Sequence, residues 1–594
     1  MKPTSHSTAF LLASALAASP AAAQTTSRVS LDSNGAQVNA ASLDPSISVD
    51  GRFVAFTSYA TNLVTGDTNG ERDVFVRDRQ SGTTERISVD SSGLQANGFS
   101  ECPAISADGR FVAFSSNASN LVAGDTNGFT DVFLRDRLLG TTVRVSISST
   151  GAQGNSNLSY PWVAISGDGN FVAFSGDASN LVPGDTNGWG DLFVRSMQTA
   201  TTDRVSISSG GTQANWESLR PAFSADGRFV AFESNASNLD IGDTNGVSDV
   251  FVRDRQLMTT TCVSVDPTGV PGSLPSYGAS LSADGHFVAF NSRSSLVPAD
   301  QLPYYDVYIR DLQSSTTEWV SVAVGGAQTD EGSYFPSLSG DGRFVAFHSM
   351  ATNLIAGDTN SSQDVFLRDR QLQVTTRLSI STAGTQQTLN SDKPSISIDG
   401  RFVAFRSDAS GLVSGDTNGW GDIFLRDSGV PLPASFCFGD GSGVACPCGN
   451  NGTAGRGCQN SASTGGAILA AAGVASLAND TLALSSTGEL PSVLSIFLQG
   501  DVAITGVTFG DGVRCAGGAL SRLYVHNAAA GVVSAPIAGD LSIHARSAAL
   551  GDVLSAGSPR YYQTYYRDPV LAFCSSPSGN TWNISSGVTV TWTW

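Results

Sequence analysis

Lysine, histidine and long apolar runs are scarce in this chain of 594 residues. Lysine occurs only at Lys2 and Lys393, and five histidines serve the whole chain. Asp plus Glu number 52 against 33 for Lys plus Arg, which gives a net charge of −19 at pH 7. This acidic balance argues against nucleic acid, whose phosphates require a basic surface. No apolar run reaches the roughly 20 residues that a membrane-spanning helix needs. We therefore predict neither a nucleic-acid partner nor a membrane span.

Motifs of familiar catalytic chemistry are also absent. The histidines beyond His6 have no metal spacing such as H-E-x-x-H, and no G-x-S-x-G setting is present. Acidic loops offer carboxylates of the kind used in glycoside hydrolysis, but no single pair stands out. These absences favour a non-catalytic binding or scaffold protein. The alternative is a secreted glycan-active or peptide-cleaving hydrolase.

Residues 1–23 have the features of an export signal. A short polar start precedes the apolar stretch 9–18, and Ala21-Ala22-Ala23 offers a small-residue cleavage site. We expect an exported protein that is extracellular or periplasmic.

What the chain does contain is a repeat, D-G-R-F-V-A-F-x-S. Its Asp-Gly pair occurs seven times at intervals of about 58 residues, and a period of this size indicates one supersecondary unit repeated along the chain. The seven aspartates are Asp50, Asp108, Asp168, Asp226, Asp284, Asp341 and Asp399.

One copy predicts four short antiparallel strands. Residues 45–48 and 53–56 flank the Asp50-Gly51 pair, which is a strong hairpin signal between β-prone runs. Residues 73–77 and 86–89 supply the third and fourth strands. Four strands in each of seven copies predict an all-β fold, a seven-bladed β-propeller.

The seventh copy stops after its third strand, at residues 422–426. A match to the missing strand lies at the other end of the chain, because residues 28–35 resemble residues 86–93. We expect the N-terminal strand to complete the last blade and close the ring, which would remove free sheet edges.

The pattern S-x-D-G-R-F-V-A-F followed by D-V-F-V-R-D resembles the repeat of TolB-type, WD-like propellers. The resemblance covers about residues 25–427. It implies the propeller fold and a protein or peptide ligand, while some relatives carry attached peptidase domains. We therefore expect a propeller at 24–427 after the signal at 1–23, a linker at 428–436 and a second domain at 437–594.

One predicted face of the propeller repeats almost unchanged. It carries the Asp-Gly turns and an arginine that ends each third strand, for example Arg77. The alternatives are a ring of anion-binding arginines or a repeated structural bridge to a carboxylate such as Asp50. We favour the bridge.

The opposite face differs from copy to copy, just before each first strand. Mixed aromatic and charged side chains at a concave mouth suit a protein, peptide or glycan ligand, although drift in unconstrained loops is the alternative. The predicted ligand-binding residues are Trp162, Trp216, Arg220, Tyr277, Tyr334, Phe335 and Lys393.

A loop G-D-T-N-G-x-x-D recurs on this variable face. Carboxylate and amide oxygens two residues apart suit Ca²⁺, and the loop resembles the calcium loop of integrin-type propellers without its central Asp-Gly. Local Asx-turn chemistry without metal is the alternative. The fifth copy has Leu302 in place of Asn. The predicted calcium ligands of the six complete copies are Asp67, Asn69, Asp73, Asp125, Asn127, Asp131, Asp185, Asn187, Asp191, Asp243, Asn245, Asp249, Asp358, Asn360, Asp364, Asp416, Asn418 and Asp422.

Cysteines concentrate in the last quarter of the chain. In an exported protein they favour disulfides over a zinc site, and six cysteines allow 15 pairings. We predict two bridges among the first four and a bridge from Cys515 to Cys574, within a β-sandwich. The six are Cys437, Cys446, Cys448, Cys458, Cys515 and Cys574.

Overall fold

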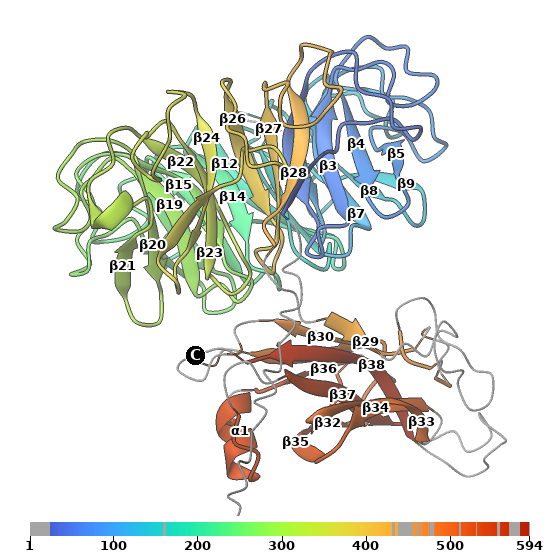
Figure 1. Cartoon of the computed structure of the whole chain (residues 1–594). Helices are drawn as coiled ribbons and strands as arrows, with labels where there is room; N and C mark the ends of the chain where they lie inside the picture. The colour runs from blue at the N-terminus through green and yellow to red at the C-terminus, as the bar shows by residue number, and fades with distance from the viewer. Residues whose placement is uncertain are drawn as a thin grey trace, which may run out of the picture.

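A computed structural model describes residues 24–158, 162–429, 434–436, 456–472 and 475–554 with short gaps, 559–568 and 582–592. The described chain is almost entirely β-structure (Figure 1). It consists of seven four-stranded antiparallel sheets, followed by a C-terminal part with sheets of its own. The predicted all-β class and the repeated four-stranded unit are confirmed.

The seven sheets follow one another along the sequence. The first three are β2 (Ser42–Ile47), β3 (Phe53–Ser58), β4 (Asp73–Asp78) and β5 (Thr83–Arg86); β6 (Ser100–Ile105), β7 (Phe111–Ser116), β8 (Asp131–Asp136) and β9 (Thr141–Arg144); and β10 (Val163–Ile165), β11 (Phe171–Gly176), β12 (Asp191–Ser196) and β13 (Thr201–Arg204). The next three are β14 (Ser218–Phe223), β15 (Phe229–Ser234), β16 (Asp249–Asp254) and β17 (Thr259–Cys262); β18 (Ser276–Leu281), β19 (Phe287–Ser292), β20 (Asp306–Asp311) and β21 (Thr316–Trp319); and β22 (Ser333–Leu338), β23 (Phe344–Ser349), β24 (Asp364–Asp369) and β25 (Val374–Arg377). The seventh sheet combines β26 (Ser391–Ile396), β27 (Phe402–Ser407) and β28 (Asp422–Asp427) with β1 (Thr25–Arg28). A short 3₁₀ turn, Val324–Gly326, follows the fifth sheet.

The second strand of each sheet is buried on both faces, which explains its continuous apolar run. In β3, Val54, Ala55 and Phe56 have no exposed surface. Phe56 packs on Phe75 of β4 with ring centroids 6.0 Å apart. Strands covered on both faces do not alternate apolar and polar residues, so this run indicates a sheet packed between two neighbours.

The Asp-Gly turns join the seven copies into a cyclic series of backbone hydrogen bonds. Each N–H donates to a carbonyl of the next copy over 2.8 to 3.2 Å, and the seventh copy donates back to the first. The donors in order are Val49, Ala107, Gly167, Ala225, Ala283, Gly340 and Ile398.

The turn glycines are required sterically at the same junctions. Gly51 has a φ of +70°, and a Cβ there would lie 2.3 Å from the Phe402 ring of the seventh sheet. The other six turn glycines meet the equivalent phenylalanine of the preceding copy. The D-G-R-F motif therefore couples each sheet to its neighbour as well as forming its own hairpin.

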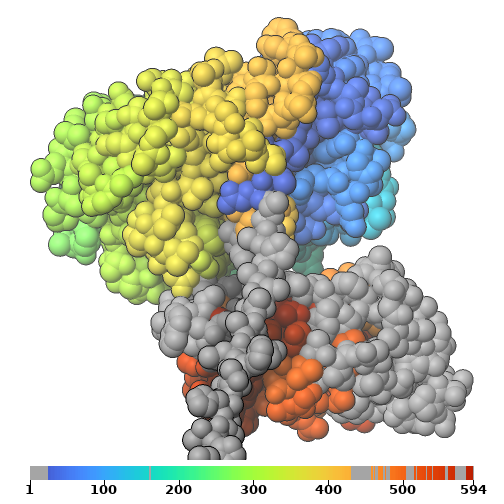
Figure 2. Space-filling view, viewed as in Figure 1, coloured from blue at the N-terminus to red at the C-terminus, as the bar shows by residue number. Residues whose placement is uncertain are grey.

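Strand β1 pairs antiparallel with β28, with Arg28 opposite Phe424 and Thr25 opposite Asp427. Beyond the strand, Val29 N–H donates to Ile423 O at 2.7 Å. Thr26 also reaches the sixth copy, because its N–H donates to Thr382 Oγ1 at 3.0 Å. In Figure 2 the blue atoms at the start of the described chain accordingly lie against yellow and orange ones. The expected pairing of the N-terminal strand with the last copy is present.

The C-terminal part contains a five-stranded and a three-stranded sheet that share one buried core. The first is β29 (Ala434–Phe436), β38 (Trp582–Thr591), β37 (Pro559–Arg567), β32 (Leu494–Gly500) and β35 (Ser521–Asn527); the second is β30 (Ile468–Ala472), β31 (Ala483–Thr487) and β36 (Val532–Ala535). Strands β33 (Val502–Phe509) and β34 (Gly512–Gly517) form a separate pair, and α1 spans Ile543–Ala549. Leu484, Phe497, Tyr562 and Trp592 meet in the shared core. The domain boundaries stay a prediction, because 430–433 and 437–455 lie outside the described residues.

Candidate functional site

A β-bulge interrupts the first strand of the repeated sheets. In β14 the register with β15 shifts between Leu219 and Ala222, and the same shift recurs in five other first strands. Arg220 within this bulge has a φ of 50°, a conformation uncommon for residues other than glycine. Bulges re-aim side chains and are frequent beside functional sites.

The bulge position carries a different residue in every copy. Six of the seven have positive φ, and Trp162 is the third copy's equivalent. The seven residues are Asp44, Cys102, Trp162, Arg220, Gly278, Phe335 and Lys393. Five of them, Asp44, Cys102, Trp162, Phe335 and Lys393, line one cavity of about 220 Å³. Equivalent backbone positions thus bring chemically distinct groups to one cavity. We call this cavity, lined by these five residues, the mouth.

Two cations stand over aromatic rings at this mouth. Lys393 Nζ lies 5.6 Å from the Trp162 ring centroid. Arg220 Cζ lies 5.3 Å from Trp162 and 5.2 Å from Phe335. Such distances allow cation–π attraction, which is worth about 0.5–2 kcal/mol depending on desolvation.

Each of these cations also has a carboxylate partner. Lys393 forms an ion pair with Asp44, and Arg220 Nε lies 3.5 Å from Glu233 Oε1. Burial alone lowers the pKa of Lys393, but Asp44 outweighs it and holds that pKa above its ordinary value. The mouth is therefore a charge-balanced cluster and not an open anion site.

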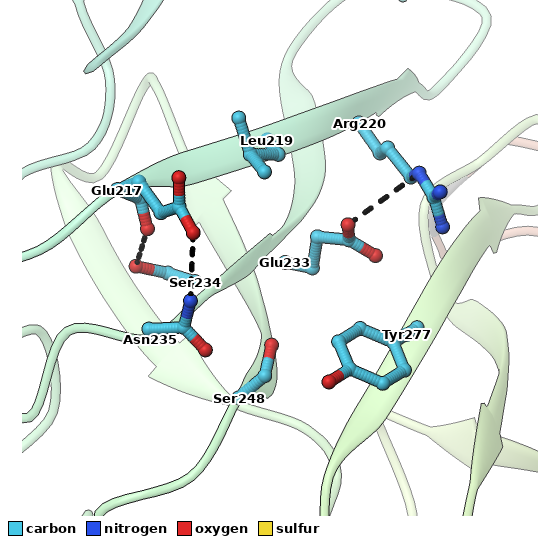
Figure 3. Close-up of a pocket in the computed structure, with 8 residues that line it drawn as sticks. All are labelled: Glu217, Leu219, Arg220, Glu233, Ser234, Asn235, Ser248 and Tyr277. Carbon is cyan, nitrogen blue, oxygen red and sulfur yellow. Dashed lines mark hydrogen bonds and ion pairs between the residues drawn. The ribbon is translucent and has the colours of Figure 1, made fainter. Parts of the chain in front are cut away.

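A second cavity, of about 320 Å³, opens beside the mouth between the fourth and fifth sheets (Figure 3). Its lining residues are Glu217, Leu219, Arg220, Glu233, Ser234, Asn235, Ser248 and Tyr277. Asn235 Nδ2 donates to Glu217 Oε1 at 3.0 Å. Glu233 accepts from Gly278 N–H at 3.2 Å, and its burial raises its pKa. This volume lies at the small end of the roughly 300–1,000 Å³ typical of ligand pockets.

The structure divides the seven predicted ligand-binding residues among neighbouring places. Trp162, Phe335 and Lys393 line the mouth, while Arg220 and Tyr277 line the second cavity. Tyr334 packs against Tyr305, with ring centroids 5.3 Å apart. Ligand binding by all seven stays a prediction.

Trp216, the seventh, stacks on Trp189, with centroids 4.1 Å apart and an interplanar angle of 18°. The repeat pattern alone did not single out Trp189 as a ligand-binding residue, because it occupies a variable position within the repeated acidic loop. A signal was present, since tryptophan stands at that position only in the third and seventh copies, at Trp189 and Trp420.

An arginine bridges the two aspartates of the acidic loop in five copies. In the first copy, Arg86 Nη1 lies 3.3 Å from Asp67 Oδ1 and 3.4 Å from Asp73 Oδ2. The equivalents in the other four copies are Arg28, Arg144, Arg204 and Arg377. Asn69 presents its Nδ2 to Asp73 at 3.1 Å. Calcium binding by the six complete loops stays a prediction, and the arginine favours the local-turn alternative where it is present.

The fourth and fifth copies lack this arginine. In the fifth, Trp319 Nε1 donates to Asp306 Oδ1 at 3.0 Å, and the Tyr308 hydroxyl donates to Asp300. In the fourth, Cys262 takes the arginine's place. Asp243 is 5% exposed there, and its Oδ1 is buried without a hydrogen-bond partner. Burial raises the pKa of Asp249 to about 6. The fourth loop is therefore one of two loops that lack a cation between their aspartates.

We predict that Cys262→Arg stabilises the protein at pH 8 by about 1–3 kcal/mol, the usual cost of an unsatisfied buried polar group. The pKa of Asp249 is raised from 3.8 to about 6 in the folded chain. Protonation of Asp249 therefore makes its full contribution to stability below about pH 4, and this contribution is lost as pH rises through about 6. The gain in unfolding free energy from Cys262→Arg should accordingly be smaller at pH 5 than at pH 8.

Denaturant unfolding at both pH values measures this gain, with Cys262→Ser as the control. An equal gain from Cys262→Ser would contradict the bridge.

The arginines that end the third strands have partners other than those predicted. Arg77 donates to the backbone oxygen of Asp32 at 2.8 Å and to Thr84 Oγ1 at 3.1 Å. The predicted bridge to Asp50 is wrong, because Asp50 accepts from Ser48 Oγ and from Arg52 N–H instead. The arginine of D-G-R makes the carboxylate bridge, since Arg52 donates two hydrogen bonds to Asp78. The arginines of the repeated face therefore bond to groups within the protein and stabilise the fold.

Two of the six C-terminal cysteines, Cys458 and Cys515, lie within the described residues, and both are disulfide-bonded. The other four fall outside them, so the predicted pairing stays a prediction. Cys102 and Cys262 are free and buried. Among the described residues, no helix is long and apolar enough to cross a membrane. In the same part of the chain, no group of three or more His, Cys, Asp or Glu converges as a metal site.

No family model matches the chain, and no curated protein matches it. Among solved structures it is similar to TolB from Acinetobacter baumannii, with 17% identity over 51% of this chain and 58% of that one, and a TM-score of 0.31. It is also similar to an oligogalacturonate lyase from Vibrio parahaemolyticus, with 13% identity over 69% and 98% of the two chains and a TM-score of 0.42. A prolyl endopeptidase structure matches with 10% identity over 76% and 55%, and a TM-score of 0.39. TolB, whose repeat this chain resembles, is therefore among the similar solved structures. These similarities concern the fold and not the ligand or activity.

Proposed function

We propose that this chain is an exported, non-catalytic binding protein. In this proposal its seven sheets are the blades of a propeller closed by β1, and its ligand binds on the variable face. One observation carries the proposal: seven equivalent bulge positions hold seven different residues. A specific site needs a unique arrangement of groups, and the opposite end of the molecule repeats its hydrogen bonds copy by copy.

The mouth and the adjoining cavity supply complementary contacts. Trp162 and Phe335 offer apolar surface, and Arg220 lies between them and the polar cavity. Aromatic rings bring large contact area, and a few placed polar groups give orientation and specificity. Because Arg220 and Lys393 are already paired with carboxylates, a ligand is expected to be recognised by shape and hydrogen bonding more than by net charge.

Replacing Trp162 by alanine is expected to weaken binding at least tenfold, about 1.4 kcal/mol, with little change in Tm. The reason is the loss of a half-buried ring at the mouth that touches two cations. A screen of peptides and oligosaccharides against the mature protein identifies the ligand, and calorimetry compares the variants. Arg228→Ala, on the repeating face, is the matched control. Equal weakening by Arg228→Ala, or unchanged affinity with Trp162→Ala, would place the site elsewhere.

A hydrolase is the second candidate because Glu217 and Glu233 line one cavity, and paired carboxylates serve glycoside hydrolysis. The test is incubation of the mature protein with oligosaccharides and peptides, followed by mass spectrometry. Turnover that Glu217→Gln abolishes would replace the binding proposal. Oligosaccharides or peptides that bind the protein but are recovered uncleaved would support the binding proposal.

A further inference from the structure

The stacked pair of Trp189 and Trp216 is the most unusual exposed feature of the variable face. The two side chains are 39% and 44% exposed, although large aromatic residues generally lie inside. Trp189 comes from the loop between β11 and β12, and Trp216 from the connection that leads into β14. Ser218 N–H donates to Gly190 O at 2.9 Å, which holds the two segments together. The rings therefore form a fixed, solvent-facing aromatic surface.

This aromatic surface adjoins a polar pair in the cavity of Figure 3. Trp216 directly precedes Glu217, whose carboxylate accepts from the Asn235 amide. Ser248 and Tyr277 line the same cavity with hydroxyl groups. One of the two stacked rings, that of Trp216, thus belongs to the residue directly before Glu217, which lines the cavity.

We propose that Trp189, Trp216, Glu217 and Asn235 form a binding site for a neutral carbohydrate chain. This inference rests on the proposed function and names its ligand class. One sugar ring lies with its C–H face on the tryptophan pair. The hydroxyls of the neighbouring unit bind Glu217 and Asn235, because a carboxylate accepts hydrogen bonds and an amide both donates and accepts them.

The charges at the site select a neutral sugar over an acidic one. Glu217 and Glu233 both line the cavity, and Arg220 is already paired with Glu233. The whole chain carries −19. A uronate or sulfated sugar would meet like charge without a free cation in this cavity.

The backbone at the site is unsuited to an added peptide strand. Asn235 N–H donates to Glu217 O at 3.3 Å, and Ser218 N–H is bonded to Gly190 O. Peptides that add to a sheet need free backbone donors and acceptors at its edge. The groups left for a ligand here are side chains, which suits hydroxyls.

The seventh copy provides an internal control. Trp420 occupies the same loop position as Trp189 and is 52% exposed. At the position of Trp216, the connection that follows the seventh copy has Ala40. No aromatic ring among the described residues stacks on Trp420. This exposed tryptophan therefore shares the local sequence of Trp189 but has no stacked aromatic partner within the described part of the chain.

The test measures binding of neutral oligomers of glucose, mannose, xylose and N-acetylglucosamine to the full mature chain. Trp189→Ala, Trp216→Ala and Glu217→Ala are each expected to reduce affinity for the bound oligomer at least tenfold. Trp420→Ala is expected to leave it unchanged. Because the two tryptophans are exposed, their variants should melt close to the parent, and saturating oligomer should alter the fluorescence of the parent but not of Trp216→Ala.

Three outcomes would overturn the inference. They are the absence of binding to any neutral oligomer, equal weakening by Trp420→Ala, and preference for uronate-containing oligomers or peptides. A peptide whose binding is lost with Trp162→Ala but retained with Trp216→Ala would remove the carbohydrate site and leave the proposed function standing. If no ligand in the screen binds the mature protein, both the carbohydrate site and the proposed binding function are wrong.

Discussion

A chain that lacks residues 24–31 is expected to lose most of its folded population at 25 °C. Val29 is buried, and burial of a valine side chain contributes about 1.5–3 kcal/mol. Ser30 and Arg28 are partners of the fully buried Asp422. Leaving a buried charge without its partner costs about 3–5 kcal/mol. The sum is about 5 kcal/mol or more, comparable with the whole stability of many domains, about 5–15 kcal/mol.

Circular dichroism and denaturant unfolding of the deletion variant measure this loss. A synthetic peptide of residues 24–31 is the sharpest control, because it can add to the free edge of β28 and restore the fold in trans. A scrambled peptide should not restore it. A deletion variant that unfolds at the parent's denaturant midpoint would show that β1 does not stabilise the seven-sheet part of the chain.

Arg86→Ala is expected to destabilise the protein by about 3–5 kcal/mol at pH 8, since it leaves Asp67 and Asp73 without their shared cation. Burial already raises the pKa of Asp73. A carboxyl whose pKa is raised in the folded state favours folding most below its unfolded pKa and loses that contribution as pH rises. The defect should therefore be larger at pH 8 than at pH 5.

Urea unfolding at both pH values measures this defect. Arg79→Ala is a matched control at the other end of the same sheet: Arg79 donates to the backbone oxygen of Gly51 and is not paired with a loop aspartate. Equal losses in both variants, with no pH dependence, would show that packing and not charge compensation explains the effect. The opposite sign expected for Cys262→Arg tests the same bridge from the copy that lacks it.

Much of the fold was predictable because it is local and repeated. The Asp-Gly pair predicts a hairpin in each copy, and β2 and β3 flank the first one as expected. The strand missing after residue 427 and the matching segment at residue 28 predicted the pairing of β1 with β28. Both signals are patterns in adjacent residues, which a single sequence displays directly.

The partners of charged groups were less predictable. Arg77 and Arg52 both lie near the Asp-Gly turn, and only the packed structure shows that Arg52, and not Arg77, meets a carboxylate. In five copies the arginine that bridges the acidic loop comes from a strand outside the motif that suggested calcium; in the first copy Arg86 lies about 13 to 19 residues beyond the two aspartates. Local spacing cannot distinguish a guanidinium from a metal ion between two aspartates, because both satisfy the same negative charge.

The sequence by itself determined the repeat, the strands and the residue at each equivalent position. The tertiary structure decided which of these positions meet. Lys393 and Asp44 are 349 residues apart and form an ion pair because the seventh copy packs against the first. Trp189 and Trp216 belong to successive copies and become one surface only where a loop and a connection converge. The physical reason is that equivalent positions of five copies line the mouth, most of them at positive φ in a bulge, so a site is assembled from residues that no local pattern connects.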